Sequence, residues 1–219
     1  MARHADPNTY GPADKVLLVE GEDDQHLFWN LLEFHGYQSG VRVTDCKGFP
    51  NLCKELRVRL RNRNDRALAV VVDADTEFQN RWQSLRDLLE RAGYPNVPTS
   101  LSAQGALLAA EDWPTVGIWI MPDNLSEGMM EDFARLLVPP NDPLWKRATD
   151  AVEAIPQAER RFGSHVAKAR IHTWLAWQET PGEPIGKAIK TRSLQGQAEP
   201  AKQLVAWVAA LFQLAPATL

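Results

Sequence analysis

Short apolar runs alternate with amphipathic segments along the first two thirds of the chain. Buried strands are predicted at residues 15–19, 68–72 and 116–121, which have the required length and apolar content, and residues 41–44 alternate like a further strand. After each run, apolar residues recur three or four positions apart, as they do in helices that bury one face. This alternation predicts an α/β fold with a mainly parallel sheet that is covered by helices on both faces.

The pattern changes at the proline pair 139–140, after which no further strand-like run occurs. We therefore expect an α/β core over residues 15–138 and a helical extension over residues 139–219 that packs on it. Residues 1–14 are polar and contain two prolines, which predicts a flexible lead-in. For residues 94–115 we expect an irregular crossover or a short helix. In the extension, helices are expected at residues 144–154, 157–178 and 200–214.

The composition is that of a folded protein with an ordinary balance of apolar and charged residues. The 219 residues, 44% apolar and 24% charged, suffice for one large domain or for a core domain with an added subdomain. No apolar run approaches the roughly 18 residues that span a bilayer, and the chain starts without the apolar stretch of a secretion signal. We expect a cytoplasmic protein that does not bind membranes. Cys46 and Cys53 lack zinc-finger spacing and are expected to be reduced packing residues.

Acidic residues follow two of the predicted strands. Glu20 comes directly after the first strand, and Asp73 and Asp75 come directly after the third. Because the carboxyl ends of parallel strands share one edge of the sheet, we expect these side chains to share a pocket. Carboxylates are suitable ligands for Mg²⁺ or Mn²⁺. The alternative interpretation is that each acid caps a helix or a turn, as aspartate often does at strand ends.

The same segments resemble the motifs of a known fold. Residues 17–24 read LLVEGEDD and residues 70–75 read VVVDAD, and together they are similar to the two acidic motifs of the TOPRIM fold. The resemblance covers about residues 15–138 and is closest to small stand-alone TOPRIM proteins related to the nuclease domain of the overcoming-lysogenization-defect (OLD) family. It implies a Rossmann-like, TOPRIM-like core in which Glu20 is a metal ligand or a general acid/base. Asp73 and Asp75 would be metal ligands.

The resemblance also implies roles for residues outside these two motifs. Among the acids after Glu20, Asp24 is a further candidate metal ligand. In the segment GMMED at residues 128–132, Glu131 would add a carboxylate for a second metal, and Asp132 is the neighbour with which it could be confused. Lys168 would assist catalysis at the phosphate.

The chain departs from the relatives that it resembles in two respects. It lacks the GxxxxGK[ST] motif of an ATPase, so any regulation by ATP would require a separate ATPase partner. Its tyrosines lie in loop-like segments and no companion domain with a nucleophilic tyrosine is recognisable, which argues against the strand passage of topoisomerases.

Basic residues near the second predicted helix are candidates for phosphate contacts. Lys47 lies in the loop that precedes this helix, and Arg57 and Arg61 lie on its polar side. The alternative for the two arginines is an ordinary solvated helix face on a protein of net charge −4. His165 and His172 have no metal-ligand spacing around them and are expected at the surface or at a helix cap.

These patterns favour a divalent-metal-dependent nuclease that hydrolyses phosphodiester bonds of DNA or RNA. Three alternatives stay open. The first is a TOPRIM module that binds nucleic acid or nucleotides without turnover, or only with a partner. The second is a phosphatase of the haloacid-dehalogenase type with Asp73 as the nucleophile, although that interpretation leaves Glu20 unexplained. The third is a primase-like polymerase, although no zinc-binding segment accompanies the site.

Overall fold

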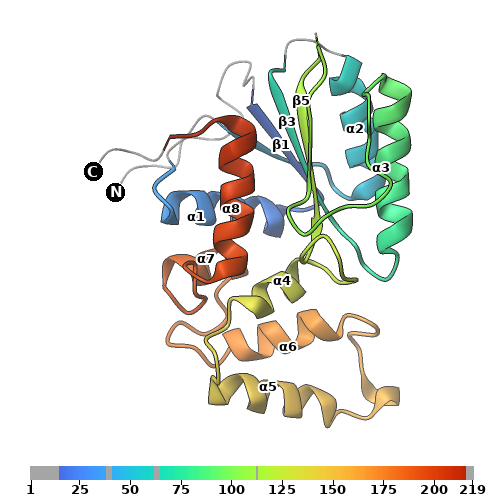
Figure 1. The fold of residues 1–219 in the computed structure, drawn as a ribbon. Helices are drawn as coiled ribbons and strands as arrows, with labels where there is room; N and C mark the ends of the chain where they lie inside the picture. Colours follow the sequence, from blue (N-terminus) through green and yellow to red (C-terminus); the bar gives the residue numbers. More distant parts are fainter. Residues whose placement is uncertain (1–14, 38–40, 62–64, 112, 216–219) are drawn as a thin grey trace.

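The computed structural model describes residues 15–37, 41–61, 65–111 and 113–215. The predicted lead-in at residues 1–14 lies outside these ranges. Within them the chain forms an α/β fold built on one sheet, shown in Figure 1. None of the described helices is long and apolar enough to cross a membrane.

The sheet has five strands in the order β2-β1-β3-β5-β4. The strands are β1 (Lys15–Val19), β2 (Arg42–Asp45), β3 (Ala67–Asp73), β4 (Ala106–Leu108) and β5 (Thr115–Met121). All pairs are parallel except that of β4 with β5. The predicted mainly parallel, Rossmann-like sheet is confirmed.

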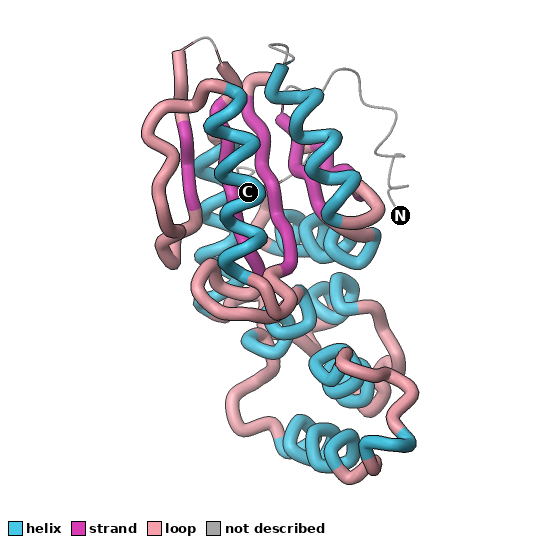
Figure 2. Tube along the Cα trace, turned by 90° about the vertical axis from the view of Figure 1, so that its right-hand side faces the viewer, coloured by secondary structure: helices cyan, strands magenta, loops and turns pink. Residues whose placement is uncertain are grey.

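Helices cover both faces of this sheet, as the apolar runs predict. Leu17 and Val19 point into one apolar cluster with α1 (Glu22–Phe34), α7 (Ile185–Lys190) and α8 (Glu199–Phe212), whereas Val16 and Leu18 point into a second cluster with α2 (Phe49–Arg61) and α3 (Phe78–Ala92). Figure 2 shows the helices on either side of the strands. Because both faces are buried, β1, β3 and β5 are apolar over most of their length. The edge strand β2 instead buries only Val43 and is otherwise polar.

Three helices lie beyond the carboxyl ends of the strands. They are α4 (Met130–Leu136), α5 (Pro143–Glu153) and α6 (Val166–Leu175). The side chain of Asp142 accepts hydrogen bonds from two backbone N–H groups in the first turn of α5 and thereby caps it. The ring of Trp174 packs edge-on against Trp145, so α5 and α6 form a pair. This pair reaches the sheet through the contact of α6 with α4.

Three local expectations were wrong or incomplete. Residues 94–115 contain the edge strand β4, because its buried Leu108 and its pairing with β5 outweigh a weak local signal. Residues 157–178 are not one helix: a short 3-10 turn at Gln157–Glu159 precedes α6, and Gly163 between them adopts a φ of +55°. The six-residue helix α7 was not expected, since so short a segment shows little periodicity.

Candidate functional site

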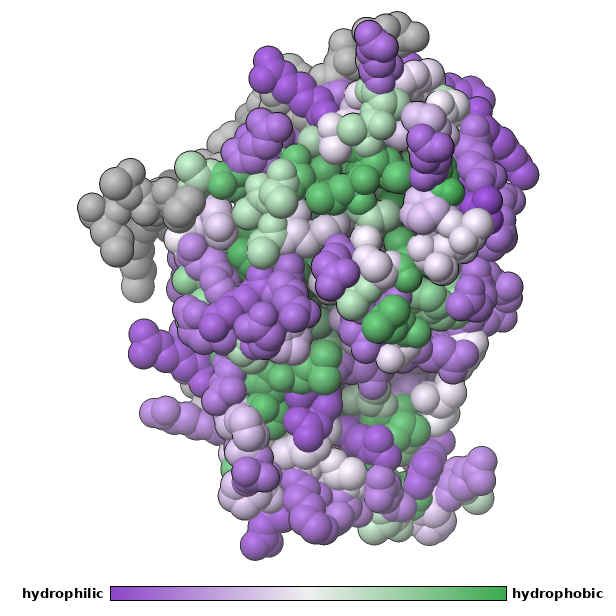
Figure 3. All heavy atoms as spheres, viewed as in Figure 1, coloured by the Kyte–Doolittle hydropathy of each residue, from purple (hydrophilic) through white to green (hydrophobic). Residues whose placement is uncertain are grey.

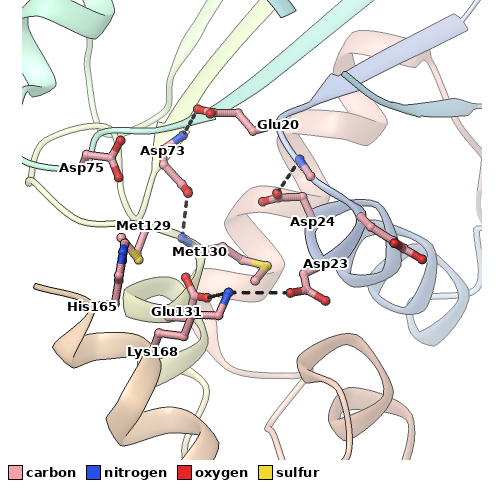
Figure 4. A pocket seen from close by; sticks show the side chains of 12 residues that line it. Glu20, Asp23, Asp24, Asp73, Asp75, Met129, Met130, Glu131, His165 and Lys168 are labelled. Carbon is pink, nitrogen blue, oxygen red and sulfur yellow. Dashed lines mark hydrogen bonds and ion pairs between the residues drawn. The ribbon is translucent and has the colours of Figure 1, made fainter. Parts of the chain in front are cut away.

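A pocket of about 510 Å³ opens at the carboxyl edge of the sheet, where β1 and β3 end and where α1, α4 and α6 begin. It contains most of the predicted site residues, and Figure 4 shows them facing one another. We call this the acidic pocket. The predicted residues that line it are Glu20, Asp24, Asp73, Asp75, Glu131 and Lys168.

Glu20 and Asp73 are joined directly. Glu20 follows the last residue of β1, and its Oε1 accepts a hydrogen bond from the backbone N–H of Asp73 at 3.0 Å. Burial raises the pKa of Glu20 above its ordinary value, although the hydrogen bond from Asp73 opposes this shift. The two predicted motifs therefore meet at one point, as the parallel sheet requires.

Asp73 connects β3 to α4. Its Oδ1 accepts a hydrogen bond from the backbone N–H of Met130, the first residue of α4, at 2.9 Å. Burial raises the pKa of Asp73 well above its ordinary value, and the neighbouring carboxylates of Asp24, Glu20 and Glu131 raise it further. Several carboxylates thus lie near Asp73 in a place where little solvent is present to screen their negative charges.

Asp24 caps a helix and faces the acidic pocket at the same time. Its Oδ2 accepts a hydrogen bond from the backbone N–H of Gly21 at 3.0 Å, which satisfies a donor at the start of α1. Burial raises its pKa to about 7, and the negative charges of Glu20 and Glu131 add to this rise. The hydrogen bond from Gly21 acts in the opposite direction and lowers the pKa. The capping and pocket interpretations therefore both hold for this residue.

The structure separates Glu131 from Asp132. Glu131 is buried, and its Oε1 lies 3.1 Å from Nζ of Lys168 in the acidic pocket. Asp132 instead accepts a hydrogen bond from the backbone N–H of Met129 at 3.0 Å and caps α4. Of the two neighbours, the structure therefore brings Glu131 to the site.

Lys168 reaches the acidic pocket from α6. Besides Glu131, its Nζ lies 3.9 Å from Oδ2 of Asp23. Burial alone would lower the pKa of Lys168, but the carboxylates of Glu131, Asp23 and Asp73 outweigh this and raise it. The lysine is therefore a stable cation beside the acids. His165, exposed at the start of α6, also lines the pocket.

Asp75 forms an ion pair that the sequence did not reveal. Its Oδ2 lies 2.6 Å from Nη2 of Arg81, in the first turns of α3. Its backbone adopts a φ of +51° and exchanges two hydrogen bonds of 2.8 Å with Gly128. The only sequence signal for Arg81 was its position early in a helix that starts at the carboxyl edge of the sheet.

The structure does not bring the three phosphate-contact candidates into the acidic pocket. Lys47 follows β2, with an exposed side chain that forms an ion pair of 2.5 Å with Asp45. Arg57 and Arg61 are exposed on α2, beyond its first turns. Since α2 starts at the carboxyl edge and a helix rises about 1.5 Å per residue, both arginines lie away from the acids. Their contact with phosphate stays a prediction.

The acids line one pocket without converging on one point. In the ranges that the structure describes, no three histidine, cysteine, aspartate or glutamate side chains lie close enough together to hold a metal ion as they stand. The pocket nevertheless combines hard oxygen donors, like charges that raise one another's pKa, and a lysine at its rim. Such a site can attract a cation and can exchange protons near neutral pH.

Comparison with known proteins gave one match. Residues 14–213 match the family model described as "Protein of unknown function (DUF3226)". No match was found among curated proteins or among solved structures. Because the matched segment spans most of the chain, this protein belongs to the DUF3226 family.

Proposed function

We propose that the acidic pocket binds a divalent cation, Mg²⁺ or Mn²⁺, and hydrolyses phosphodiester bonds of nucleic acid. The observation that supports this most is that Glu20, Asp24 and Asp73 line one pocket at the edge of the sheet. Among the described residues, few positive charges lie near them, so their mutual repulsion is largely uncompensated and contributes to their raised pKa values. A cation that binds between carboxylates lowers the electrostatic free energy of their mutual repulsion. The resemblance to TOPRIM nucleases is what extends this proposal from cation binding to hydrolysis of phosphodiester bonds.

The donor set fits a hard divalent ion. Oxygen ligands from carboxylates suit Mg²⁺ and Mn²⁺ better than softer metals. Glu20, Asp24 and Asp73 are the residues that would hold the ion, since Asp75 and Glu131 are paired with Arg81 and Lys168. Binding requires side-chain movements that bring these oxygens together, because the acids do not converge as they stand. Free enzymes often tighten such contacts only with substrate bound.

The residues of the chain would share the work of hydrolysis. When bound, the cation supplies a nucleophilic water at neutral pH and stabilises charge on the phosphate. Glu20, whose pKa is raised by burial, would accept a proton from the attacking water. The water oxygen would bond to phosphorus while the bond from phosphorus to the leaving oxygen breaks, and the leaving oxygen would take a proton from solvent. Lys168 at the rim would release Glu131 and bind a non-bridging oxygen of the phosphate instead.

Nucleic acid is the substrate class that we favour over a small phosphate ester. The lining of the pocket includes the exposed residues Glu22, Asp23 and His165, so a polymer backbone can reach it without entering a closed cavity. We expect the activity to be cytoplasmic. If ATP regulates it, the resemblance implies a separate ATPase partner.

The test is cleavage of plasmid, linear single-stranded DNA and RNA by the purified protein, over a range of Mg²⁺ and Mn²⁺ with EDTA controls. We expect cleavage by the wild type and at least about a hundredfold loss in Asp73→Ala, typical of the loss of one electrostatic group from an active site. Asp150→Ala is the matched control, because Asp150 is exposed on α5 and pairs only with surface Lys146 among its described contacts.

Equal cleavage by the wild type and by Asp73→Ala would contradict the proposal. Binding of Mn²⁺ that depends on Asp73, without cleavage of any substrate, would instead favour a binding module without turnover. That second function is compatible with the same pocket, and this comparison separates the two.

A further inference from the structure

The acids of the acidic pocket differ in their partners. Asp75 pairs with Arg81, and Glu131 pairs with Lys168. Asp24 and Asp73 instead accept hydrogen bonds from backbone N–H groups. A cation that enters the pocket therefore meets carboxylates with different partners, and it has to compete with an arginine for the negative charge of Asp75.

Arg81 is held in place from two sides. It belongs to α3, and its backbone N–H donates to the carbonyl of Glu77 at 2.9 Å. Its guanidinium lies 4.2 Å from the ring centroid of Phe49, the first residue of α2. This distance is within the range of cation–π attraction. With 21% of its side chain exposed, Arg81 is a fixed partner rather than a mobile surface arginine.

The backbone of Asp75 is fixed as well. Its paired hydrogen bonds with Gly128 tie the turn after β3 to the loop before α4. The side-chain direction of Asp75 is then set by what binds its carboxylate. A charge-assisted hydrogen bond of 2.6 Å to Arg81 is a strong interaction of this kind.

We infer that Arg81 is a positioning residue that keeps Asp75 out of the cation site formed by Glu20, Asp24 and Asp73 in the protein without substrate. This inference rests on the proposed metal site. Its consequence is that the free protein binds its first cation without Asp75. Asp75 joins when Arg81 takes another anionic partner, for which a phosphate group of the substrate has the right charge and geometry.

The test is a double-mutant cycle on Mn²⁺ affinity, measured by titration calorimetry without nucleic acid. In the wild-type background we expect Asp75→Asn to change the dissociation constant by less than about twofold, whereas Asp73→Asn should weaken binding by at least about tenfold, a typical effect of removing a group from a metal site. In the Arg81→Gln background, Asp75→Asn should also weaken binding by at least about tenfold. The difference between the two backgrounds cancels the general loss of the arginine charge.

Two further variants keep the result interpretable. Arg81→Lys retains a cation that can pair with Asp75, so Asp75→Asn should have a small effect in that background too. Arg91→Gln is the matched control, because Arg91 is an exposed arginine on the same helix that pairs with Asp87 at 3.7 Å. Thermal denaturation of each variant checks that it is folded. If Arg81→Gln unfolds, Arg81→Met replaces it as the test, because methionine also removes the positive charge but keeps an apolar side chain that can pack against Phe49.

The outcomes are distinct. If Asp75→Asn weakens Mn²⁺ binding as much as Asp73→Asn does in the wild-type background, Asp75 is already a ligand and the inference is wrong, while the proposed metal site stands. If Asp75→Asn has no effect in any background, Arg81 does not control a ligand and the inference is again wrong. If the wild type binds no Mn²⁺, the proposed function fails as well.

Discussion

Each carboxylate of the acidic pocket has its own partners, and these partners decide its charge. Glu20, Asp24 and Asp73 are desolvated and surrounded by other acids, so their pKa values are raised. Asp75 and Glu131 form ion pairs with Arg81 and Lys168. At the scale of the residue, the pocket is therefore a set of acids that hold protons more firmly than usual beside acids that are already paired.

A pH dependence follows from Asp24. Its pKa lies near 3.8 in the unfolded chain and at about 7 in the folded protein. The stabilisation that this difference provides is fully present below pH 3.8 and is lost as the pH rises through 7. Without metal, the melting temperature should therefore fall between pH 6 and pH 8, and Mn²⁺ should oppose the fall.

Asp24→Asn is the informative variant for this pH dependence, because asparagine keeps an oxygen that can accept from Gly21 but does not titrate. We expect its melting temperature in EDTA to fall less between pH 6 and pH 8 than that of the wild type. An equal fall in both proteins would show that Asp24 does not carry the effect. Calorimetric scans at several pH values provide the measurement.

At the scale of the element, Lys168 depends on how α5 and α6 pack. Trp174 on α6 is fully buried, contacts Trp145 on α5 edge-on, and donates from Nε1 to the side chain of Asp142 at 3.3 Å. These contacts fix α6 beside α4, from which Glu131 reaches the same lysine. The ion pair in the pocket thus rests on apolar packing outside it.

Trp174→Ala should lower the free energy of unfolding by about 3–5 kcal/mol, as large-to-small changes of buried aromatic residues typically do. Trp177→Ala is the matched control, since Trp177 is 42% exposed just beyond the end of the same helix, and we expect a change within about 0.5 kcal/mol. Urea denaturation followed by circular dichroism measures both. A similar small effect of the two changes would contradict this view of the α5–α6 pair.

At the scale of the whole molecule, helix α8 packs against the sheet although it follows the strands by many residues. Helix α8 packs on β3 and β5, and its buried Leu204, Val208 and Leu211 belong to the same apolar cluster as the strands. Figure 3 shows polar residues over most of the visible face, with apolar residues in smaller patches among them. Residues 139–215 therefore contribute to the core of the molecule as well as to the pocket.

Deletion of residues 199–219 should for this reason prevent normal folding. It removes α8 and leaves apolar side chains of one sheet face without cover. We expect loss of the near-ultraviolet circular dichroism signal and of cooperative thermal unfolding. Deletion of residues 1–14, which precede β1 along the chain, is the comparison. A shortened protein without α8 that unfolds cooperatively near the wild-type temperature would contradict the prediction.

The strands of the parallel sheet, most of the described helices and the position of the acids at strand ends could be predicted from the order of the residues alone. This was possible because a strand buried on both faces is a local apolar run, and because parallel strands end at a common edge. The resemblance to TOPRIM proteins added Glu131 and Lys168, which the structure brings to the same pocket.

Other features of the fold and of the pocket could be seen only in the three-dimensional structure. Strand β4 forms because β5 offers it an edge, α7 and α8 cover α1 and the sheet from more than 60 residues beyond β5, and Arg81 takes Asp75 as its partner. Each of these depends on how two separate segments pack in space or on the direction of one side chain. Hydrophobic periodicity carries neither kind of information, because it records only which face of an element is buried.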